Sequence, residues 1–447
     1  MNRPTPRLTP RLTRRAALLL PLAATGCSFI DGLLGDAKVP LPGKREAVAA
    51  TTRPGLAIDP ANTARITVPP PTATATWPQP GGSPAHVVGN VATRGFTPAW
   101  RASIGEGGGY REKITAQPIV IPGRVVTMDS DAKVACFDLA TGSRAWRTST
   151  EADDSRSTNV GGGVSYADGT VFAATGRAEL LALDAASGAI RWRKPLGSPA
   201  RSAPTVADKR LVVLTLDDQV QSFDFAGQRQ WGYQAATAAT TLFGQASPAF
   251  ADGLVVAAFG SGELVALRAE SGTLAWSDSL AASRGRNSLV DLSGIRALPV
   301  IDEGRVIAIG GGGLLVALDL RSGRRLWERD VGGLQTPWIA GGFVFVQTLD
   351  QVLAAVGRDD GRVRWATDLP RYDNPEKKRD PLFWTGPLMA NSRLILSGSN
   401  GTALSVDPVT GTLIGRIDLA DAAAVAPVAA SGTLLVLTDD GTLQAFR

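Results

Sequence analysis

The chain is poor in the side chains that most enzymes use for catalysis. Its 447 residues include one histidine, His86, and two cysteines, Cys27 and Cys136. No Cys-x-x-Cys pair and no cluster with the spacing of metal ligands occurs, so the sequence offers no recognisable zinc or dithiol site. Cys136 lies in the strand-like stretch "KVACFDL", which predicts a buried free thiol. His86 has no recognisable Ser or Cys partner, and we expect a surface residue.

Long apolar runs are also absent. Fifty glycines and 29 prolines favour many short strands joined by tight turns over long helices. Past the N-terminus, no stretch reaches the roughly 18 to 20 apolar residues that a membrane-spanning helix needs. With 44% hydrophobic residues the chain can bury a large core, and its length indicates two domains or a repeat architecture.

An excess of positive charge is confined to the first 26 residues. The chain has 46 Lys and Arg against 41 Asp and Glu, a net charge of +5. Residues 1–26 contain five arginines and no acidic residue, so 41 residues of each sign remain. A near-neutral chain lacks the basic surface that neutralises nucleic-acid phosphates. We therefore expect no nucleic-acid partner.

Residues 11–28, "RLTRRAALLLPLAATGCS", have the parts of an export signal: a basic start, an apolar run and small residues at a cleavage point. The ending "AATGC" is similar to a bacterial lipobox, which predicts a signal peptide over 1–26 and acylation of Cys27, for example with palmitate. An ordinary secretory signal is the alternative, and the arginine pair leaves the Sec and Tat routes open. Several acyl chains give a stable anchor, and Ser28 after the cysteine implies transport to the outer membrane.

Residues 27–76 have a different composition from the rest, rich in Pro, Thr and Ala, as in "VPPPTATATWPQPGG". Such a composition favours an extended chain without a packed core. We expect a lipid-anchored tether over 27–76 and a folded domain over 77–447.

A fifteen-residue pattern recurs through the folded domain, as in "AELLALDAASGAIRW", "GELVALRAESGTLAW" and "GLLVALDLRSGRRLW". An apolar strand leads to a turn with Ser or Thr and Gly, and Trp follows four residues later. The turn glycines recur at spacings of 38 to 51 residues, which suit the blade of a β-propeller. The glycines are Gly142, Gly188, Gly227, Gly272, Gly323, Gly361 and Gly411, and the tryptophans are Trp100, Trp146, Trp192, Trp231, Trp276, Trp327 and Trp365.

A second recurring element, as in "SAPTVADKRLVV" and "ASPAFADGLVV", precedes each turn and completes eight units of four short strands. The chain ends at "DGTLQAFR", one strand short, and the missing Trp strand occurs near the other end in "FTPAWRASIG". We therefore predict an all-β fold: an eight-bladed β-propeller of four-stranded antiparallel blades, closed by an N-terminal strand. The tryptophans are expected to pack between blades.

Taken together, the lipobox, the tether and the Trp-turn blades resemble the BamB (YfgL) family of outer-membrane β-barrel assembly lipoproteins. Matches beyond the blade pattern are "PLPGKREAV" at 40–48, "WPQPGGSPAH" at 77–86 and "KKRDPLFWTGP" at 377–387. The resemblance implies a non-enzymatic scaffold of the BAM complex, without cofactor, at the periplasmic face of the outer membrane. Its implied partners are the POTRA domains of BamA and other BAM components, with unfolded outer-membrane proteins as further candidates.

The resemblance also implies that two loops bind the partner. The first falls on "TTLFGQASP", where Leu242 and Gly244 match the family and Phe243 departs from its arginine. The second falls on "SGIRALP", where Gly294 and Arg296 replace two aspartates and Asp291 lies close by. We expect both loops on one rim, with Leu242 and Phe243 as apolar anchors and Asp291 and Arg296 as polar contacts.

Two alternatives remain open. Propellers with this Trp turn also resemble the quinoprotein dehydrogenases, which carry pyrroloquinoline quinone (PQQ) and calcium. This chain lacks their adjacent cysteine pair, and lipidation weighs against a periplasmic PQQ-dependent oxidoreductase. The other alternative is an envelope-binding propeller with a different partner. The charged run "NPEKKRDP" at 374–381 is predicted to be an insertion between blades. Most such runs are solvated loops, but an insertion on one rim is also where propellers bind partners.

Overall fold

The computed structural model describes residues 54–59, 65–109, 112–151, 159–236, 244–281 and 294–447, all within one compact unit over 53–447. The described part is all-β apart from one short 3-10 helix, η1 (Pro54–Leu56). No helix in these ranges is long and apolar enough to cross a membrane. Cys27 and the predicted signal peptide lie outside the described residues.

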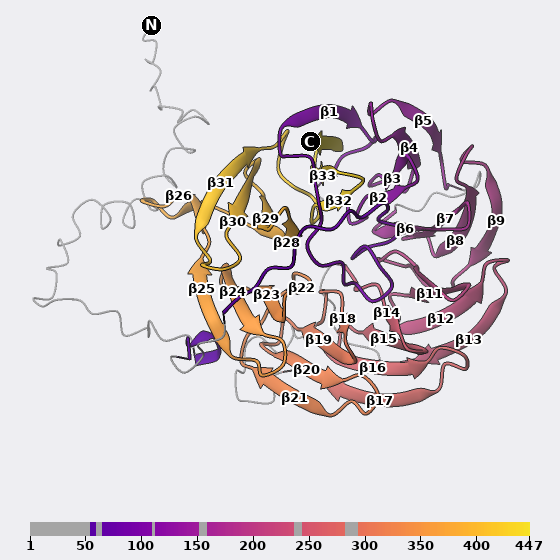
Figure 1. Cartoon of the computed structure of the whole chain (residues 1–447). Helices are drawn as coiled ribbons and strands as arrows, with labels where there is room; N and C mark the ends of the chain where they lie inside the picture. The colour runs from indigo at the N-terminus through magenta and orange to yellow at the C-terminus, as the bar shows by residue number, and fades with distance from the viewer. Residues whose placement is uncertain (1–53, 60–64, 110–111, 152–158, 237–243, 282–293) are drawn as a thin grey trace, which may run out of the picture. The chain divides into compact units, whose positions relative to one another are not determined.

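Eight sheets of four antiparallel strands form a ring, as predicted (Figure 1). Blades 1 to 4 are built from β2 (Ile119–Ile121), β3 (Arg124–Met128), β4 (Val134–Asp138) and β5 (Arg144–Thr148); β6 (Gly162–Ala167), β7 (Thr170–Thr175), β8 (Glu179–Asp184) and β9 (Ile190–Pro195); β10 (Thr205–Ala207), β11 (Arg210–Leu214), β12 (Gln219–Asp224) and β13 (Arg229–Gln234); β14 (Ala249–Ala251), β15 (Leu254–Ala258), β16 (Glu263–Arg268) and β17 (Leu274–Ser279).

Blades 5 to 8 repeat the same arrangement. They are built from β18 (Val300–Asp302), β19 (Arg305–Ile309), β20 (Leu315–Asp319) and β21 (Arg325–Arg329); β22 (Trp338–Ala340), β23 (Phe343–Gln347), β24 (Val352–Gly357) and β25 (Val363–Asp368); β28 (Trp384–Ala390), β29 (Arg393–Gly398), β30 (Thr402–Val406) and β31 (Leu413–Asp418); β32 (Val428–Ala430), β33 (Thr433–Leu437), β34 (Thr442–Phe446) and β1 (Pro98–Ser103).

The ring closes where the sequence predicts it. Strand β1 pairs antiparallel with the last strand, β34, so that Trp100 lies opposite Ala445 and Ser103 opposite Thr442. The N-terminal strand thus supplies the outer strand of blade 8, so this blade has four strands like the other seven. The closed eight-bladed propeller is confirmed.

The tryptophans of the repeat join neighbouring blades. Each indole Nε1 donates a hydrogen bond to a carbonyl in the glycine turn of the next blade, for example Trp231 to Ala269 at 2.8 Å and Trp276 to Leu320 at 2.7 Å. The turn glycine lies against the indole of the preceding blade. A Cβ on Gly272, whose φ is +71°, would lie 2.6 Å from the Trp231 indole. Glycine is therefore needed here both for its positive φ and for the close approach of the indole.

Blade 7 lacks this tryptophan because Gly415 occupies its register position, opposite Ser405. In the next blade the outer strand is β1, from the other end of the chain, and not a strand that follows β34 through a glycine turn. A groove of about 300 Å³ is lined here by Phe96, Pro98, Arg393, Gly415 and Ile417, among others. The interruption in the repeat therefore coincides with the closure seam.

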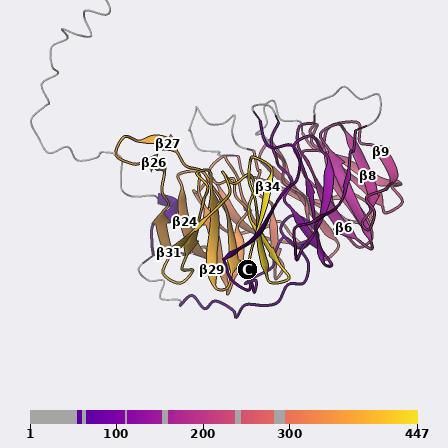
Figure 2. The same ribbon diagram turned by 90° about the horizontal axis from the view of Figure 1, so that it is seen from above.

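The two faces of the ring differ in their connections. One face, which we call the turn face, carries the turns after the first and third strands of each blade. The other, the mouth face, carries the connections from the outer strand of one blade to the inner strand of the next. The hairpin of β26 (Tyr372–Asn374) and β27 (Arg379–Pro381) lies within one of these mouth-face connections, between β25 and β28. Figure 2 shows this hairpin at one edge of the ring.

Candidate functional site

The segment over 77–94 crosses the centre of the ring on the turn face (Figure 1). Its backbone or side chains bond with the inner part of every blade. It pairs with Val120 and Tyr166, with Val206 through Gln79, with Phe250 and Ile301, with the Trp338 indole, with Met389 and Asn391, and with Gly432. We call residues 77–94 the central plug, because they close the channel from this side.

The core of the plug is aromatic. The Trp77 side chain is only 1% exposed, and its ring stacks on Trp338 with centroids 6.3 Å apart and an interplanar angle of 10°. Residues 65–76, which the composition placed in the tether, also contact the ring: the Ser431 N–H donates to the Thr74 carbonyl at 2.7 Å, and the Ser431 hydroxyl donates to the Ala75 carbonyl at 2.7 Å. The ring contacts therefore begin before residue 77.

His86 is buried in the plug, so the expectation of a surface residue is wrong. It is 4% exposed, and its Nδ1 lies 2.7 Å from the Pro299 carbonyl. Since a carbonyl only accepts, Nδ1 carries the proton. Burial lowers the pKa of His86 to about 4, although the hydrogen bond to Pro299 partly opposes this. His86 is a neutral structural residue at neutral pH.

On the mouth face the channel opens as a small cavity of about 140 Å³. The repeat positions this lining: residues just before the proline of each second recurring element point to the mouth. The polar side chains that line it among the described residues are Thr115, Gln117, Arg201, Ser202, Gln245, Ser247, Arg296, Gln335, Thr336 and Thr385. Pro80 of the plug contributes to the lining, so the plug forms part of the wall of this cavity.

Most mouth side chains hold neighbouring blades together. Gln117 accepts from the Gly81 N–H at 3.1 Å and donates to the Ala426 carbonyl at 3.3 Å. Gln245 accepts from the Arg201 N–H at 3.3 Å and donates to the Thr215 carbonyl at 2.9 Å. These amides fix the shape of the cavity by satisfying backbone groups that strand pairing leaves free.

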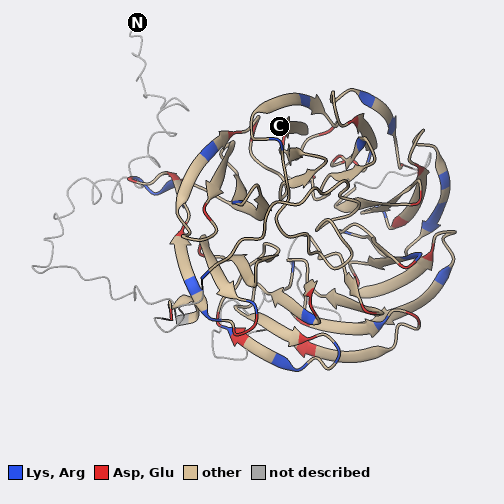
Figure 3. Ribbon diagram, viewed as in Figure 1, with Lys and Arg blue, Asp and Glu red and all other residues tan. Residues whose placement is uncertain are grey.

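Two arginines give the mouth its charge. Arg201 precedes β10 of blade 3 and Arg296 precedes β18 of blade 5, and both line the same cavity. Burial lowers the pKa of both guanidinium groups, although Arg296 keeps an exposed surface towards the opening. No acidic side chain is among the described residues that line the mouth. Figure 3 shows that elsewhere the charged residues lie mainly on outer strands and turns, while the centre of the ring is largely uncharged.

The described ends of the two loops predicted to bind a partner lie beside this mouth. Leu242, Phe243 and Asp291 lie outside the described residues, whereas Arg296 is described. A Cβ on Gly244, at the end of the first loop, would lie 3.1 Å from Nε of Arg296, at the end of the second. Gly244 and Arg296 also line a second small cavity together with Gly260 and Ile295. The described ends of both loops therefore adjoin on the mouth face.

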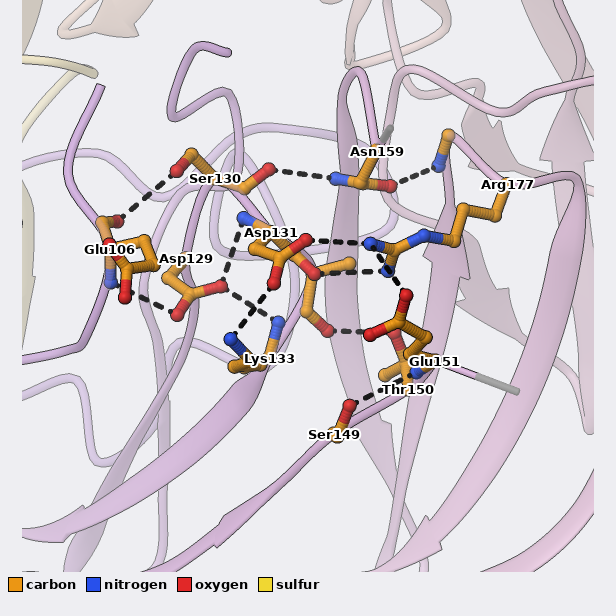
Figure 4. Close-up of polar contacts among 12 residues, drawn as sticks. Glu106, Asp129, Ser130, Asp131, Lys133, Ser149, Thr150, Glu151, Asn159 and Arg177 are labelled. Atoms are coloured by element: carbon orange, nitrogen blue, oxygen red, sulfur yellow. Dashed lines mark hydrogen bonds and ion pairs between the residues drawn. The ribbon is translucent and has the colours of Figure 1, made fainter. Parts of the chain in front are cut away.

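A polar network anchors the same face at blades 1 and 2 (Figure 4). The Asp129 carboxylate is fully buried and accepts from the backbone N–H groups of Glu106 and Lys133 at 3.2 and 2.8 Å. Arg177, 5% exposed, pairs with Asp131 at 2.6 Å. Burial would raise the pKa of Asp131, but hydrogen bonds from Lys133 and Arg177 lower it.

Further polar bonds fix the connection that leaves blade 1. Asn159 donates to the carbonyls of Ser130 and Gly161 at 3.1 and 2.9 Å, and Thr150 donates to the Ala132 carbonyl at 2.8 Å. Both ends of the connection between β5 and β6 are thus held to the ring. This network serves structure, because its buried donors and acceptors satisfy one another.

Exposed apolar side chains also occur on the mouth face. Phe383 is 62% exposed and Leu349 is 47% exposed, and both lie where blades 6 and 7 adjoin, since Gln347 donates to the Trp384 carbonyl at 2.9 Å. The charged run at 374–381 forms most of the β26–β27 hairpin next to them. Exposed apolar groups rimmed by charged residues are typical of surfaces that bind other proteins.

Neither Cys136 nor a metal-ligand cluster provides a reactive group in the described part of the structure. Cys136 is buried and free, as predicted, and burial raises the pKa of its thiol to about 11, so it stays a neutral thiol. Among the described ranges, no group of three or more His, Cys, Asp or Glu residues is arranged to hold a metal ion.

The sequence did not single out Arg201 or the glutamines of the mouth. The repeat register would have located them. The position three residues before the repeat's proline is occupied by Arg201, Gln245 and Arg296. That register position faces the channel, and the two arginines are the described cations on it.

Comparison with known proteins agrees with this architecture. The family model described as "Outer membrane protein assembly factor BamB" matches residues 130–367 and 352–447. Proteins of that name from Yersinia pestis and Burkholderia pseudomallei are 27% and 28% identical to this chain over 358 and 356 residues. The alignments cover 78% of this chain in both cases, and 88% and 87% of the two relatives.

Solved structures share the fold. BamB from Moraxella catarrhalis gives a TM-score of 0.66 at 18% identity, covering 79% of this chain and 99% of that one. Quinohemoprotein alcohol dehydrogenase from Comamonas testosteroni gives the same TM-score at 14% identity, covering 84% and 81%. At these identities the likeness shows the propeller fold alone. The family match over most of the repeat is more specific: the chain belongs to the BamB family of outer membrane protein assembly factors.

Proposed function

We propose that this protein is an assembly factor for outer-membrane β-barrel proteins that acts by binding other proteins. The observation that carries the proposal is the family match over residues 130–447 on a closed eight-bladed propeller whose channel is crossed by the plug on the turn face. A closed ring of blades carries its connections on one framework, which suits a scaffold.

The proposed partner is the POTRA region of BamA, within the BAM complex, and the proposed contact surface is the mouth face. The adjacency of Gly244 and Arg296 supports this, because the two loops that the family resemblance implicates end side by side. Leu242 and Phe243 would supply apolar anchors, and Asp291 and Arg296 polar contacts. The exposed Phe383 and Leu349 on the same face extend the apolar surface available to a partner.

A non-enzymatic role is supported by the size of the cavity. Ligand and cofactor pockets usually enclose about 300–1,000 Å³, whereas the mouth encloses about 140 Å³ and the plug fills the channel behind it. The plug residues make hydrogen bonds with the inner strands, so they could not leave without breaking them. We therefore infer a binding protein in preference to a quinone-dependent oxidoreductase.

The proposed location is the periplasmic face of the outer membrane, with the ring tethered through acylated Cys27. Mass spectrometry of the membrane-extracted protein tests this directly: a lipid-modified N-terminal Cys27 is expected. An unmodified chain that begins at another residue would remove the anchor from the proposal.

The partner is tested by purifying the tagged protein from its own membranes in mild detergent and identifying stoichiometric co-purifying proteins. Binding of the purified POTRA region is then compared among the wild-type protein, Leu242→Asp with Phe243→Asp, and Val409→Asp. Val409 is a matched control because it is 43% exposed on the turn face. Loss of binding only in the double variant supports the proposal, and equal binding by all three proteins refutes the assigned surface.

A further inference from the structure

We propose that the groove at the closure seam binds a tryptophan side chain from an extended segment of another protein. This seam groove lies at the circumference of the ring, between β31 of blade 7 and the residues that lead into β1 of blade 8 (Figure 1). The loops that end at Gly244 and Arg296 belong to the connections between blades 3, 4 and 5. The seam groove is therefore a second site, independent of the proposed POTRA surface.

The first support is the repeat itself. In seven blades the tryptophan of the outer strand lies opposite a small residue on the neighbouring strand. The pairs are Trp146 with Cys136, Trp192 with Ala182, Trp231 with Ser222, Trp276 with Ala266, Trp327 with Ala317, Trp365 with Ala355 and Trp100 with Ala445. Blade 7 keeps the small residue, Ser405, but places Gly415 opposite it. The blade therefore retains the small position on which an indole packs elsewhere, and lacks the indole.

The second support is the space beside Gly415. Among the described residues, a Cβ on Gly415 would meet only the Ser405 Cβ within 4 Å, at an ordinary contact distance of 3.7 Å. The seam groove has a volume of about 300 Å³, which is at the lower end of the range of about 300–1,000 Å³ for ligand pockets. A groove of this size suits one aromatic side chain and excludes a folded element.

The third support is the chemistry of the walls. Phe96 and Ile417, both half-buried, are apolar walls of the groove. The exposed Arg393 has its guanidinium carbon 5.8 Å from the centroid of the Phe96 ring, and a guanidinium favours the face of an aromatic ring. The Ser405 hydroxyl is buried and has no hydrogen-bond partner among the described residues, so the N–H of an indole would satisfy it.

The source of the ring follows from the sequence. The chain has ten tryptophans, all of them among the described residues, and none lines the seam groove. An indole in the groove therefore comes from another molecule. Since β31 is the terminal strand of its sheet, an extended segment can pair with its edge while one side chain enters the neighbouring groove.

The first experiment tests whether the groove fits an indole. Gly415→Trp is compared with Gly415→Ala by urea unfolding, because the alanine variant removes the conformational cost of glycine in a strand without adding a ring. Gly415 does not have a positive φ, so its backbone accepts both residues. We expect a higher urea midpoint for the tryptophan variant, since its ring buries apolar surface in the groove. A midpoint at or below that of the alanine variant overturns the fit.

The second experiment measures binding from solution. Fluorine NMR of N-acetyl-5-fluorotryptophanamide is recorded with the wild-type protein, Gly415→Ala and Gly415→Trp. We expect a dissociation constant of about 1 mM or tighter for the first two proteins, and binding at least about tenfold weaker for the tryptophan variant, whose own ring occupies the groove. N-acetyltryptophanamide should compete and N-acetylleucinamide should not. Equal binding by all three proteins, or no binding by the wild type in the millimolar range, overturns the inference.

A third measurement locates the ligand without a variant at Gly415. The methyl signal of Ile417, identified by its loss in Ile417→Val, is followed during titration of the wild-type protein with N-acetyltryptophanamide. The control is Ile190, which is exposed on the outer strand of blade 2, where Trp192 is present. A shift of the Ile417 signal alone supports the site, and equal shifts or none overturn it. None of these measurements uses the POTRA region, so the seam groove and the proposed function fail independently.

Discussion

His86 makes the free energy of unfolding of the propeller depend on pH. No second histidine contributes in the same pH range. It is the chain's one histidine, and burial lowers its pKa from 6.5 to about 4 in the folded state. In the unfolded state the imidazole titrates near its ordinary pKa. Between these values the unfolded chain binds a proton that the folded chain does not, so the free energy of unfolding rises with pH.

The magnitude follows from the two pKa values. The contribution is fully present above pH 6.5 and decreases as the pH falls from 6.5 towards 4, by at most about 1.4 kcal/mol per pH unit. Between pH 7.5 and 4.5 the expected loss is about 2.5 kcal/mol. For a protein whose net stability is of the order of 5–15 kcal/mol, this is a large fraction.

The matched control is His86→Asn. Asparagine tolerates the positive backbone φ of this position, 59°, better than most residues, and its amide N–H₂ can donate to the Pro299 carbonyl as Nδ1 does. Asparagine does not titrate, so the variant should lose the pH dependence that the histidine causes and keep the part that carboxylates cause.

The assay is urea unfolding at constant ionic strength from pH 7.5 to 4.5, followed by circular dichroism and tryptophan fluorescence. Coincident transitions from the two probes justify a two-state free energy. We expect the difference between wild type and His86→Asn to change by about 2.5 kcal/mol over this range. Parallel curves for the two proteins would refute the buried, neutral histidine.

Three further predictions concern the packing of the ring. Trp77→Ala removes a 1%-exposed indole stacked on another tryptophan and should destabilise the protein by about 3–5 kcal/mol, with new proteolytic cleavage within 77–94. Gly272→Ala should destabilise more than Gly253→Ala, because both have φ above +70° but only the former meets an indole within 3 Å; their difference in urea midpoint isolates the steric clash. Asp319→Asn should weaken acid sensitivity: hydrogen bonds from Ser322 lower the pKa of Asp319, so its contribution is present above pH about 4 and is lost as the pH falls through the lowered value.

The blade architecture could be predicted because the repeat encodes it locally. The turn glycines, the tryptophan four residues later and the alternation of strands recur at fixed register, and a missing outer strand at the C-terminus together with Trp100 near the N-terminus implies the closure. Each of these signals lies within about fifteen residues, where side-chain spacing determines strand and turn.

The plug could not be predicted in the same way. Residues 77–94 follow no repeat, and their partners are distant in sequence: the Pro299 carbonyl that His86 contacts is 213 residues away, and Gln79 pairs with Val206 across 127 residues. A composition rich in proline and small polar residues suits an extended tether and an extended plug equally well. A plug differs from a tether only in its pairing with the inner strands of the blades, which the segment's own sequence does not encode.

The plug also supports the choice of the mouth face as the proposed binding face. On the turn face, its hydrogen bonds already occupy the inner-strand groups near the axis, so a partner there would meet satisfied backbone and short turns. On the mouth face, Arg201 and Arg296 line an opening whose wall includes Pro80 of the plug, and the exposed Phe383 lies on the same face. The plug therefore leaves the mouth face as the one on which we propose that the partner binds.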